Sequence, residues 1–361
     1  MTTEFQRPNI FAMTGYTPGE QPADPATIKL NTNENPYPPS PQVFDALQRF
    51  DAAYLRRYPN PTASDFRLAA AKLHGVEPEQ IIATRGGDEL LRLILTTFVD
   101  PGDSVAVAEP SYSLYPVLTA IQGGQLLDLG LTSDWRLAPG FVDRANEAKC
   151  KVALIVNPHA PSGALMDEAS LRTIAEAFNG LILVDEAYVD FVSNAGHDLT
   201  QFAVKAGNVV LLRTLSKGYG LAGLRFGYGI GHARLIEPML TKTRDSYNLD
   251  AISQSLAVAA IQDQGYIEET RRQVIEARLE LQVALGALGF EVAPSHANFV
   301  LATVPRSGPS ALSIYQALKS RQILVRYFDQ DRLRDKLRIT VGTPEEQHQL
   351  IKALREILQR D

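Results

Sequence analysis

This sequence has a single cysteine, no long apolar run and no excess of positive charge. Cys150 is the only cysteine among 361 residues, so no disulfide can form within the chain, which fits a reducing compartment. No apolar run approaches the roughly 18 residues that span a bilayer. The start, MTTEFQRPNIFAM, lacks the basic and apolar segments of a signal peptide. Lys and Arg total 35 against 41 Asp and Glu, which argues against nucleic acid as the main partner. We expect a soluble, cytoplasmic protein with neither a membrane nor a nucleic-acid partner.

Several catalytic motifs are absent as well. The sequence has no G-x-x-x-x-G-K-[ST] loop for nucleoside triphosphates and no G-x-S-x-G elbow for a serine nucleophile. Its six histidines are scattered singly, without the spacing of a metal site. We therefore expect no P-loop, no serine-hydrolase elbow and no metal.

The apolar segments that are present predict an α/β protein. Short runs rich in β-branched residues, such as KVALIVN, GLILVDEAY and NVVLLRT, alternate with helical stretches such as DFRLAAAKLHG. Strands that are apolar on both faces indicate a mostly parallel sheet covered by helices on both sides. After about residue 250 a long helix is followed by mixed strands and helices, which is typical of a smaller α+β domain.

These patterns divide the chain into three parts. Residues 1–40, rich in Pro, Asn and Gly, predict an arm that packs on the small domain and the active site. We expect a large domain over 41–250 and a small C-terminal domain over 251–361.

The stretch RTLSKGYGLAG, residues 213–223, allows two interpretations. Its glycines spell the G-x-G-x-x-G of a dinucleotide loop. However, five residues separate the end of the apolar strand from Gly218, and the acid at the expected distance, Glu237, lies in a predicted helix. The alternative is that Lys217 binds an aldehyde cofactor covalently, which the flanking sequence favours.

A lysine-bound pyridoxal phosphate needs a carboxylate beside its ring nitrogen. Asp185 ends an apolar strand, where acids line a ligand crevice, although a turn cap would also explain it. Tyr188 could form a hydrogen bond with the cofactor's phenolic oxygen, or it could simply pack at the end of the strand. Ser216 and Arg225 could bind the phosphate, unless Arg225 lies at the surface.

The segment TRGGDELLRL predicts the rest of an anion site. Gly86 and Gly87 permit close backbone approach, and the helix that begins near Asp88 directs N–H groups and its positive dipole end toward an anion. Asp88 could also serve only as the N-cap. Tyr112, in EPSYSLY, could stack on the ring or belong to the core.

Together these segments resemble the histidinol-phosphate aminotransferase family of fold-type I pyridoxal-phosphate enzymes. The resemblance covers nearly the whole chain, and VDEAYVDF combined with RTLSK…GLAGLR is fairly specific for that family. The other matching segments are GYTPGEQP, KLNTNENPYPPSP, RRYPNP, TRGGDELLRL, EPSYSLYP, NPHAPSG, PSHANFVL and KLRITVGTPEE.

The resemblance implies pyridoxal 5'-phosphate as cofactor and a role for each matching residue. Lys217 would bind the aldehyde as an imine and later move a proton, while Asp185 would pair with the ring nitrogen. The remaining implied contacts are Tyr188 to the phenolic oxygen, Tyr112 on the ring, Gly87, Asp88, Ser216 and Arg225 to the phosphate, and Arg338, helped by Arg326 and Tyr16, to the anionic end of the substrate. Tyr58 would reach the phosphate of the neighbouring subunit, which implies a homodimer with shared active sites.

One segment departs from the family pattern. Ala160, in NPHAPSG, stands where the family usually has an asparagine that bonds the phenolic oxygen. We expect either that Asn157 takes over this contact or that Tyr188 acts alone.

The implied reaction is a ping-pong transamination between histidinol phosphate and 2-oxoglutarate, with glutamate as the returning amine donor, in histidine biosynthesis. Alternatives on the same scaffold are an aromatic amino-acid aminotransferase and a threonine-phosphate decarboxylase. A cofactor-binding regulator is disfavoured, because the chain has no room for a DNA-binding module ahead of residue 30.

Overall fold

The apolar runs of the first two thirds of the chain form one seven-stranded sheet in the order β2-β8-β7-β6-β5-β3-β4. Strands β3 to β7 are mutually parallel, and β8 runs antiparallel to both of its neighbours. The bounds are β2 Ile81–Thr84, β3 Ser104–Val107, β4 Gln125–Asp128, β5 Val152–Val156, β6 Leu181–Asp185, β7 Val209–Thr214 and β8 Gly227–Gly231. This computed structural model describes residues 5–193 and 197–359. The predicted α/β class, with a mostly parallel sheet, is confirmed.

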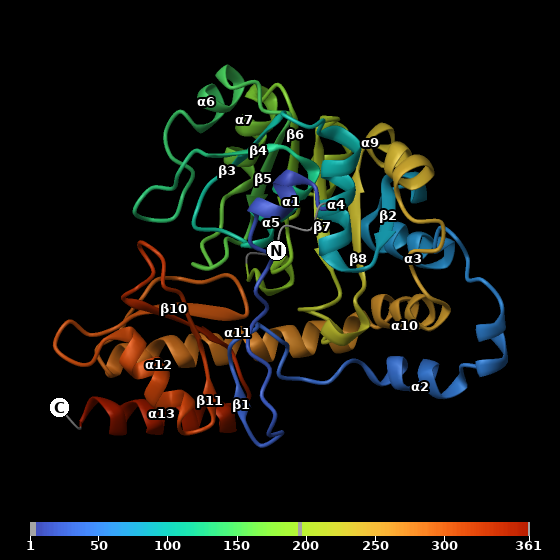
Figure 1. Ribbon diagram of the computed structural model, residues 1–361. Coiled ribbons are helices and arrows are strands. Elements are labelled where there is room, and N and C mark those ends of the chain that lie inside the picture. Colours follow the sequence, from blue (N-terminus) through green and yellow to red (C-terminus); the bar gives the residue numbers. More distant parts are fainter. Residues whose placement is uncertain (1–4, 194–196, 360–361) are drawn as a thin grey trace.

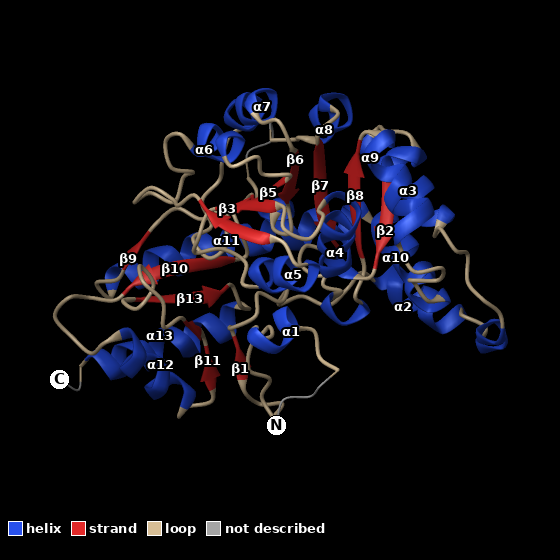
Figure 2. Cartoon of the chain, turned by 45° about the horizontal axis from the view of Figure 1, so that its top comes forward, coloured by secondary structure: helices blue, strands red, loops and turns tan. Residues whose placement is uncertain are grey.

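Helices cover both faces of this sheet, as Figure 2 shows. Along β5, Ala153 and Ile155 enter one core while Val152, Leu154 and Val156 enter the other, because successive side chains of a strand point to opposite faces. The first core also takes side chains of α3 (Ser64–His74), α6 (Phe141–Glu147), α7 (Glu168–Ala177) and α8 (Thr200–Ala206). The second takes side chains of α4 (Gly86–Phe98), α5 (Leu114–Gln122) and α9 (Ala233–Pro238). Gly75 ends α3 with a φ of 63°, as its sequence position predicts.

The C-terminal part forms a smaller module around a four-stranded antiparallel sheet in the order β12-β13-β10-β9. Its core is separate from the two cores of the large sheet. The elements are β9 Glu291–Val292, β10 Phe299–Thr303, α12 Ala311–Lys319, β12 Arg326–Tyr327, β13 Lys336–Thr340 and α13 Pro344–Leu358. Helix α11 (Gln264–Ala287) crosses from the large module to this one (Figure 1).

The packing of the helices after residue 250 bears on where the two modules divide. Helix α10 (Ala251–Gln262) lies beside α2 (Pro41–Arg49) and α3, and its Leu256 and Ile261 belong to the core of the large sheet. Along α11, Ile267 still joins that core, whereas Val274 joins the core of the small module. We propose that the two modules divide within α11, because its first part packs in the large core and its later part in the small core.

The N-terminal arm is tied to the small module. Its strand β1 (Ile28–Lys29) pairs in parallel with β11 (Ile323–Leu324), and Leu30 is buried in the small core. Further upstream, α1 (Pro8–Ala12) rests on the large module, where the Asn9 Nδ2 donates to the carbonyl of Ala120 over 2.8 Å. The arm therefore runs across the junction of the two modules (Figure 1).

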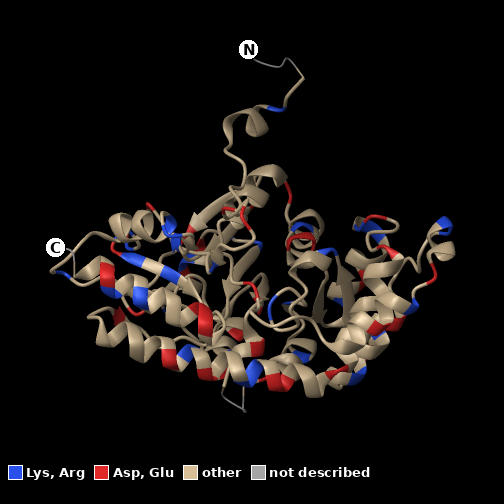
Figure 3. Cartoon of the chain, turned by 90° about the horizontal axis from the view of Figure 1, so that it is seen from below, with Lys and Arg blue, Asp and Glu red and all other residues tan. Residues whose placement is uncertain are grey.

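Acidic and basic residues are interspersed along the helices (Figure 3). Within the described part of the chain, no helix combines the length and apolar character that crossing a membrane requires.

Candidate active site

Most of the residues singled out in the sequence line one cavity of about 340 Å³. It lies where β6 and β7 end and α4 begins, and the arm and the small module close it from the other side. The predicted residues that line it are Tyr16, Gly87, Asp88, Tyr112, Asp185, Tyr188, Ser216, Lys217, Arg225, Arg326 and Arg338. This is the carboxyl edge of a parallel sheet, where crevices form because neighbouring strands end together.

Asp185 is a buried carboxylate held at the end of β6. Its Oδ2 accepts from the Tyr115 hydroxyl over 2.9 Å, and its Oδ1 accepts from the Ala187 N–H over 3.1 Å. Burial raises its pKa to about 6, and these two donors and the Lys217 ammonium partly oppose that rise. A desolvated carboxylate facing a cavity is poised to take a cationic or N–H partner.

Lys217 follows β7 and reaches the same cavity. Its Nζ donates to the carbonyl of Thr32 over 3.0 Å and lies 5.9 Å from the centre of the Tyr188 ring. Burial lowers its pKa to about 8, and the nearby Arg338 cation adds to that effect. The amine is therefore neutral at a lower pH than an ordinary lysine, and a nucleophile must be neutral.

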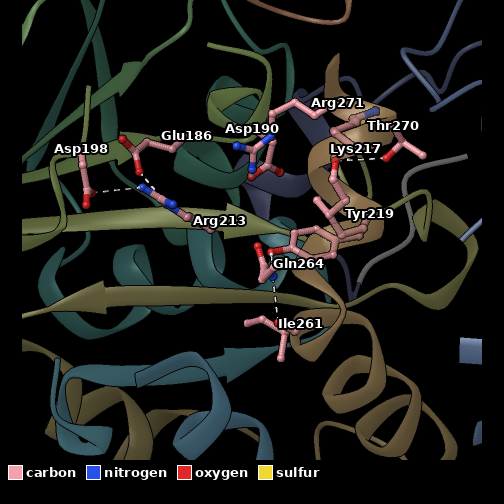
Figure 4. Close-up of polar contacts among 12 residues, drawn as sticks. Glu186, Asp190, Asp198, Arg213, Lys217, Tyr219, Ile261, Gln264, Thr270 and Arg271 are labelled. Atoms are coloured by element: carbon pink, nitrogen blue, oxygen red, sulfur yellow. Dashed lines mark hydrogen bonds and ion pairs between the residues drawn. The ribbon is translucent and has the colours of Figure 1, made fainter. Parts of the chain in front are cut away.

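A charged pair outside the cavity holds the two strands that carry these groups (Figure 4). Glu186 follows Asp185 directly, and its Oε2 lies 2.8 Å from the Nε of Arg213 on β7. Glu186 is fully buried, and Arg213 also reaches Asp198 at 3.8 Å. Because a buried carboxylate needs its partner, this pair links the ends of β6 and β7.

The anion site is predicted at the beginning of α4. Gly86 has a φ of 75°, and a Cβ there would come within 2.8 Å of the Arg225 Nη2. A Cβ on Gly87 would come within 2.9 Å of the Leu212 side chain, which would have to shift, so glycine lets the backbone lie close here. The first N–H groups of a helix have no carbonyl partners inside the helix, and they favour an anion.

Arg225 completes this corner. Its Nη2 lies 3.2 Å from Asp88 Oδ2 and its Nη1 lies 3.5 Å from Ser216 Oγ. The Arg225 backbone adopts a left-handed conformation with a φ of 56°, which turns the side chain back over the start of α4. Arg225 therefore lines the cavity, with 43% of its side chain exposed.

Tyr112 lies two residues before α5 and lines the cavity. Its hydroxyl donates to Asp88 Oδ1 over 3.0 Å, and its ring meets Tyr115 edge-on at 5.6 Å. The hydroxyl of Tyr112 has its pKa raised by burial and by the Asp88 carboxylate, so it stays protonated. The ring is thus held in one orientation beside Asp185.

Two arginines stand directly opposite each other on the small module. Arg326 of β12 is paired in register with Arg338 of β13. No carboxylate of the residues that the structure describes forms an ion pair with either of them, and the Nε of Arg338 is buried without a hydrogen-bond partner. Like charges opposite each other destabilise a sheet. An anion between the two guanidinium groups would remove that cost.

Two predicted residues lie outside this cavity. Asn157 is fully buried, and its amide is engaged by Met166: Oδ1 accepts from the Met166 N–H over 2.8 Å, and Nδ2 donates to the Met166 carbonyl over 3.1 Å. It lines a separate hollow of about 1610 Å³, so this geometry does not bring it to the position expected for a replacement of the residue at 160. Ala160 itself does line the cavity.

Tyr58 is the other predicted residue away from the cavity. Its side chain is 81% exposed and stacks on Tyr247 at 4.4 Å. Within one subunit it contacts none of the groups described above.

The glycines of the G-x-G-x-x-G pattern meet local steric and backbone requirements and do not form a dinucleotide loop. A Cβ on Gly218 would collide with Asp190, and Gly220 has a φ of 67°. No α-helix follows them, since the chain continues through a 3₁₀ turn, Ala222–Leu224, into β8. Glu237 lies in α9, as expected. The pattern therefore lacks the strand–helix context that a dinucleotide loop requires.

Sequence reasoning missed the polar groups that hold these side chains. Tyr115, in the first turn of α5, orients Asp185 through its hydroxyl. The arm segment 31–33 holds three more groups: the carbonyls of Asn31 and Thr32 accept from Arg338 and Lys217, and Asn33 donates to Tyr188. These long-range contacts leave no local signal in the sequence.

Comparison with known proteins places this chain in a family. A family model described as aminotransferase class I and II matches residues 25–354. The chain belongs to the class I and II aminotransferases. The enzyme is 44% identical over 357 residues to histidinol-phosphate aminotransferase 1 of Trichormus variabilis, with 99% of each chain covered. It is also 44% identical over 353 residues to the histidinol-phosphate aminotransferase of Geotalea uraniireducens, covering 97% of this chain and 99% of the relative. The resemblance that the motifs indicate is confirmed.

Solved structures agree with this assignment. The histidinol-phosphate aminotransferase of Sinorhizobium meliloti, in complex with pyridoxal-5'-phosphate, superposes with a TM-score of 0.87 at 26% identity. The match covers 92% of this chain and 91% of that one. The expected fold-type I architecture is therefore confirmed.

Proposed function

We propose that this aminotransferase moves an amino group between L-histidinol phosphate and 2-oxoglutarate, with pyridoxal 5'-phosphate as its cofactor. The observation that carries the substrate class is the cross-strand pair of Arg326 and Arg338, which lacks a carboxylate partner among the described residues. A guanidinium matches a phosphate or a carboxylate with two parallel hydrogen bonds, so one site can hold both substrates in turn. The 44% identity to named relatives supports the imidazole-bearing substrate.

The residues of the cavity fit the cofactor. An aldehyde needs a neutral amine, which Lys217 provides with a lowered pKa. A ring nitrogen needs a carboxylate, which Asp185 provides in a buried position. A phosphate needs the open N–H groups at the start of α4 together with Arg225 and Ser216. When bound, the cofactor supplies an electron sink for the charge that develops at the substrate's Cα.

Within this proposal, each residue of the cavity has a distinct role. The Lys217 amine, once released, would take the proton from the substrate's Cα and pass it to the carbon that had carried the aldehyde, while the Thr32 carbonyl accepts a hydrogen bond from this amine. Asp185 keeps a proton on its partner nitrogen, because a desolvated carboxylate is stabilised most by a cation. Arg338 positions the anionic end of the substrate, and its Nη2 is itself oriented by the Asn31 carbonyl.

A half-reaction screen tests this assignment. The enzyme, converted by glutamate to its amine-bearing form, would be mixed separately with imidazole-acetol phosphate, phenylpyruvate and 2-oxoglutarate. We expect the visible absorbance of the aldehyde form to return fastest with imidazole-acetol phosphate. A preference for phenylpyruvate would instead assign an aromatic amino-acid aminotransferase, and carbon dioxide released from threonine phosphate would assign the decarboxylase.

Arg338→Ala tests the shared anion site, with Arg334→Ala as its matched control. We expect it to raise KM for both the phosphate and the dicarboxylate substrate by about tenfold or more, since a charged hydrogen bond contributes about 1.5–3 kcal/mol. Arg334→Ala, which removes an exposed arginine paired with Asp329 and Asp331, should leave both values unchanged. Unchanged KM values in Arg338→Ala would exclude a shared site.

The proposed function includes a homodimer in which Tyr58 serves the partner's site. The segment around Tyr58 is rich in exposed large apolar side chains, as expected of a surface that a second copy covers. The exposed large apolar side chains between residues 44 and 58 are Phe44, Leu47, Tyr54, Leu55 and Tyr58, each at least 49% exposed.

Mixing two impaired variants tests the shared site. Lys217→Ala cannot react, and Tyr58→Ala should bind cofactor about tenfold more weakly because it loses a phosphate contact. In a hybrid dimer, one site keeps both Lys217 and the partner subunit's Tyr58. At limiting cofactor, we expect the re-equilibrated mixture to exceed the summed activity of the two variants. Strict additivity would argue that each site belongs to one subunit.

A further inference from the structure

Asn33 sits at the centre of a chain of hydrogen bonds that joins the arm, the small module and the cavity. Its side chain is 1% exposed, and its Nδ2 lies 2.9 Å from the Tyr188 hydroxyl. On its other side, the Asn33 backbone N–H and the Asn33 Oδ1 each lie 3.0 Å from the Thr340 Oγ1. Thr340 is buried on β13, two residues beyond Arg338.

The direction of every bond in this chain follows from chemistry. A backbone N–H can only donate, so the Thr340 hydroxyl accepts from Asn33 and must place its own proton elsewhere. The partner it reaches is the Asn33 Oδ1, an oxygen that can only accept. The amide is therefore held with its oxygen toward Thr340 and its NH₂ toward Tyr188.

The same reasoning fixes the Tyr188 hydroxyl. Because the oxygen of Tyr188 accepts from Asn33, its own proton must be given to another acceptor. Among the described residues, no second partner of this hydroxyl is found, and Tyr188 lines the cavity that holds Lys217 and Asp185. The proton is thus available to an acceptor in the cavity.

This direction matters because position 160 has no polar side chain. Ala160 contributes a methyl group to the same cavity, and Asn157 is engaged by Met166 outside it. Tyr188 therefore remains as a neutral hydrogen-bond donor at this side of the cavity. If its hydroxyl donated to another protein group instead, an anionic ligand oxygen here would lose this hydrogen bond.

We propose that Asn33, oriented by Thr340, is a positioning residue that forces the Tyr188 hydroxyl to donate into the cavity, toward the phenolic oxygen of the cofactor. The inference rests on the proposed function. The left-handed backbone at Asn33, with a φ of 56°, suits Asn or Asp, so Asn33→Asp changes the polarity of the side chain without changing its backbone preference.

The test is the pH at which the visible absorbance of the bound cofactor changes. A carboxylate at position 33 accepts the Tyr188 proton, and the anionic phenolic oxygen then loses its donor. We expect the apparent pKa of the absorbance change in Asn33→Asp to rise by about one to two units. Thr340→Val lets the amide turn over without adding charge, and we expect a rise of about one unit. Thr340→Ser, which keeps the hydroxyl, should match the wild type.

A double-variant comparison separates this effect from the added charge. The other charged or titratable groups that face Tyr188 are Arg338, Asp185, Lys217 and Tyr16, all unchanged in these variants. In a Tyr188→Phe background, Asn33→Asp should produce a clearly smaller shift, because only the charge remains. An equal shift with and without the Tyr188 hydroxyl, or Thr340→Val and Thr340→Ser titrating alike, would overturn the proposal. A wild-type enzyme with no cofactor absorbance at all would instead refute the proposed function.

Discussion

Lys217→Ala is expected to abolish transamination and the visible absorbance of the bound cofactor together. In the proposed function the Lys217 amine has two roles, since it would attach the aldehyde and move the proton at the substrate carbon. Loss of a general base alone lowers kcat by about 10²–10⁴-fold. The measurement is single-turnover kinetics with glutamate, followed alongside the absorbance spectrum of the purified variant.

A second lysine supplies the control for this variant. Lys336 is partly buried on β13, pairs with Asp335 at 2.7 Å and lies outside the cavity of about 340 Å³. Lys336→Ala should keep both absorbance and activity. If Lys217→Ala retained them as well, the amine that binds the cofactor would have to be sought elsewhere in the chain.

Asp185→Asn is expected to lower kcat/KM by about 10²–10⁴-fold while the cofactor stays bound. Removing the charge of a buried, hydrogen-bonded ion pair costs about 3–5 kcal/mol, and each 1.36 kcal/mol is a factor of ten in rate. The substitution should be tolerated structurally. The Ala187 N–H can still donate to the amide oxygen, and the Tyr115 hydroxyl can accept from the new NH₂. Steady-state kinetics and cofactor titration measure the two effects separately.

Tyr115→Phe provides a graded comparison for that variant. It keeps the Asp185 charge and removes one hydrogen bond to the carboxylate, which raises the pKa of Asp185 further. We expect a loss of activity well below that of Asp185→Asn. An Asp185→Asn enzyme with wild-type kcat/KM would remove Asp185 from its role.

Much of the cavity could be predicted because its residues follow directly on apolar strands. Asp185 ends β6, and Lys217 comes three residues after the end of β7. Parallel strands that are neighbours in the sheet end at the same edge, so these two groups meet without any further information. The start of α4 is readable in the same way, from two glycines ahead of an apolar helix.

Other parts of the cavity depend on strand register and long-range hydrogen bonds that no local sequence pattern predicts. Arg326 faces Arg338 only because β12 and β13 pair in that register, and Asn33 reaches Tyr188 across 155 residues of chain. Asn157 had the right residue type near the expected position. However, the side-chain amide of Asn157 is hydrogen-bonded to the backbone of Met166, because the chain after β5 folds back onto it.

The sequence by itself determined the α/β class, the order of strands and helices, and the chemistry of the amine and the carboxylate, because apolar periodicity and residue type are local properties. Tertiary structure alone decided which core each end of α11 joins, that Thr340 meets Asn33, and that the arm reaches Lys217 through the Thr32 carbonyl. The physical reason is that these contacts join groups far apart in the chain, whose distance and direction exist only after the two modules have packed.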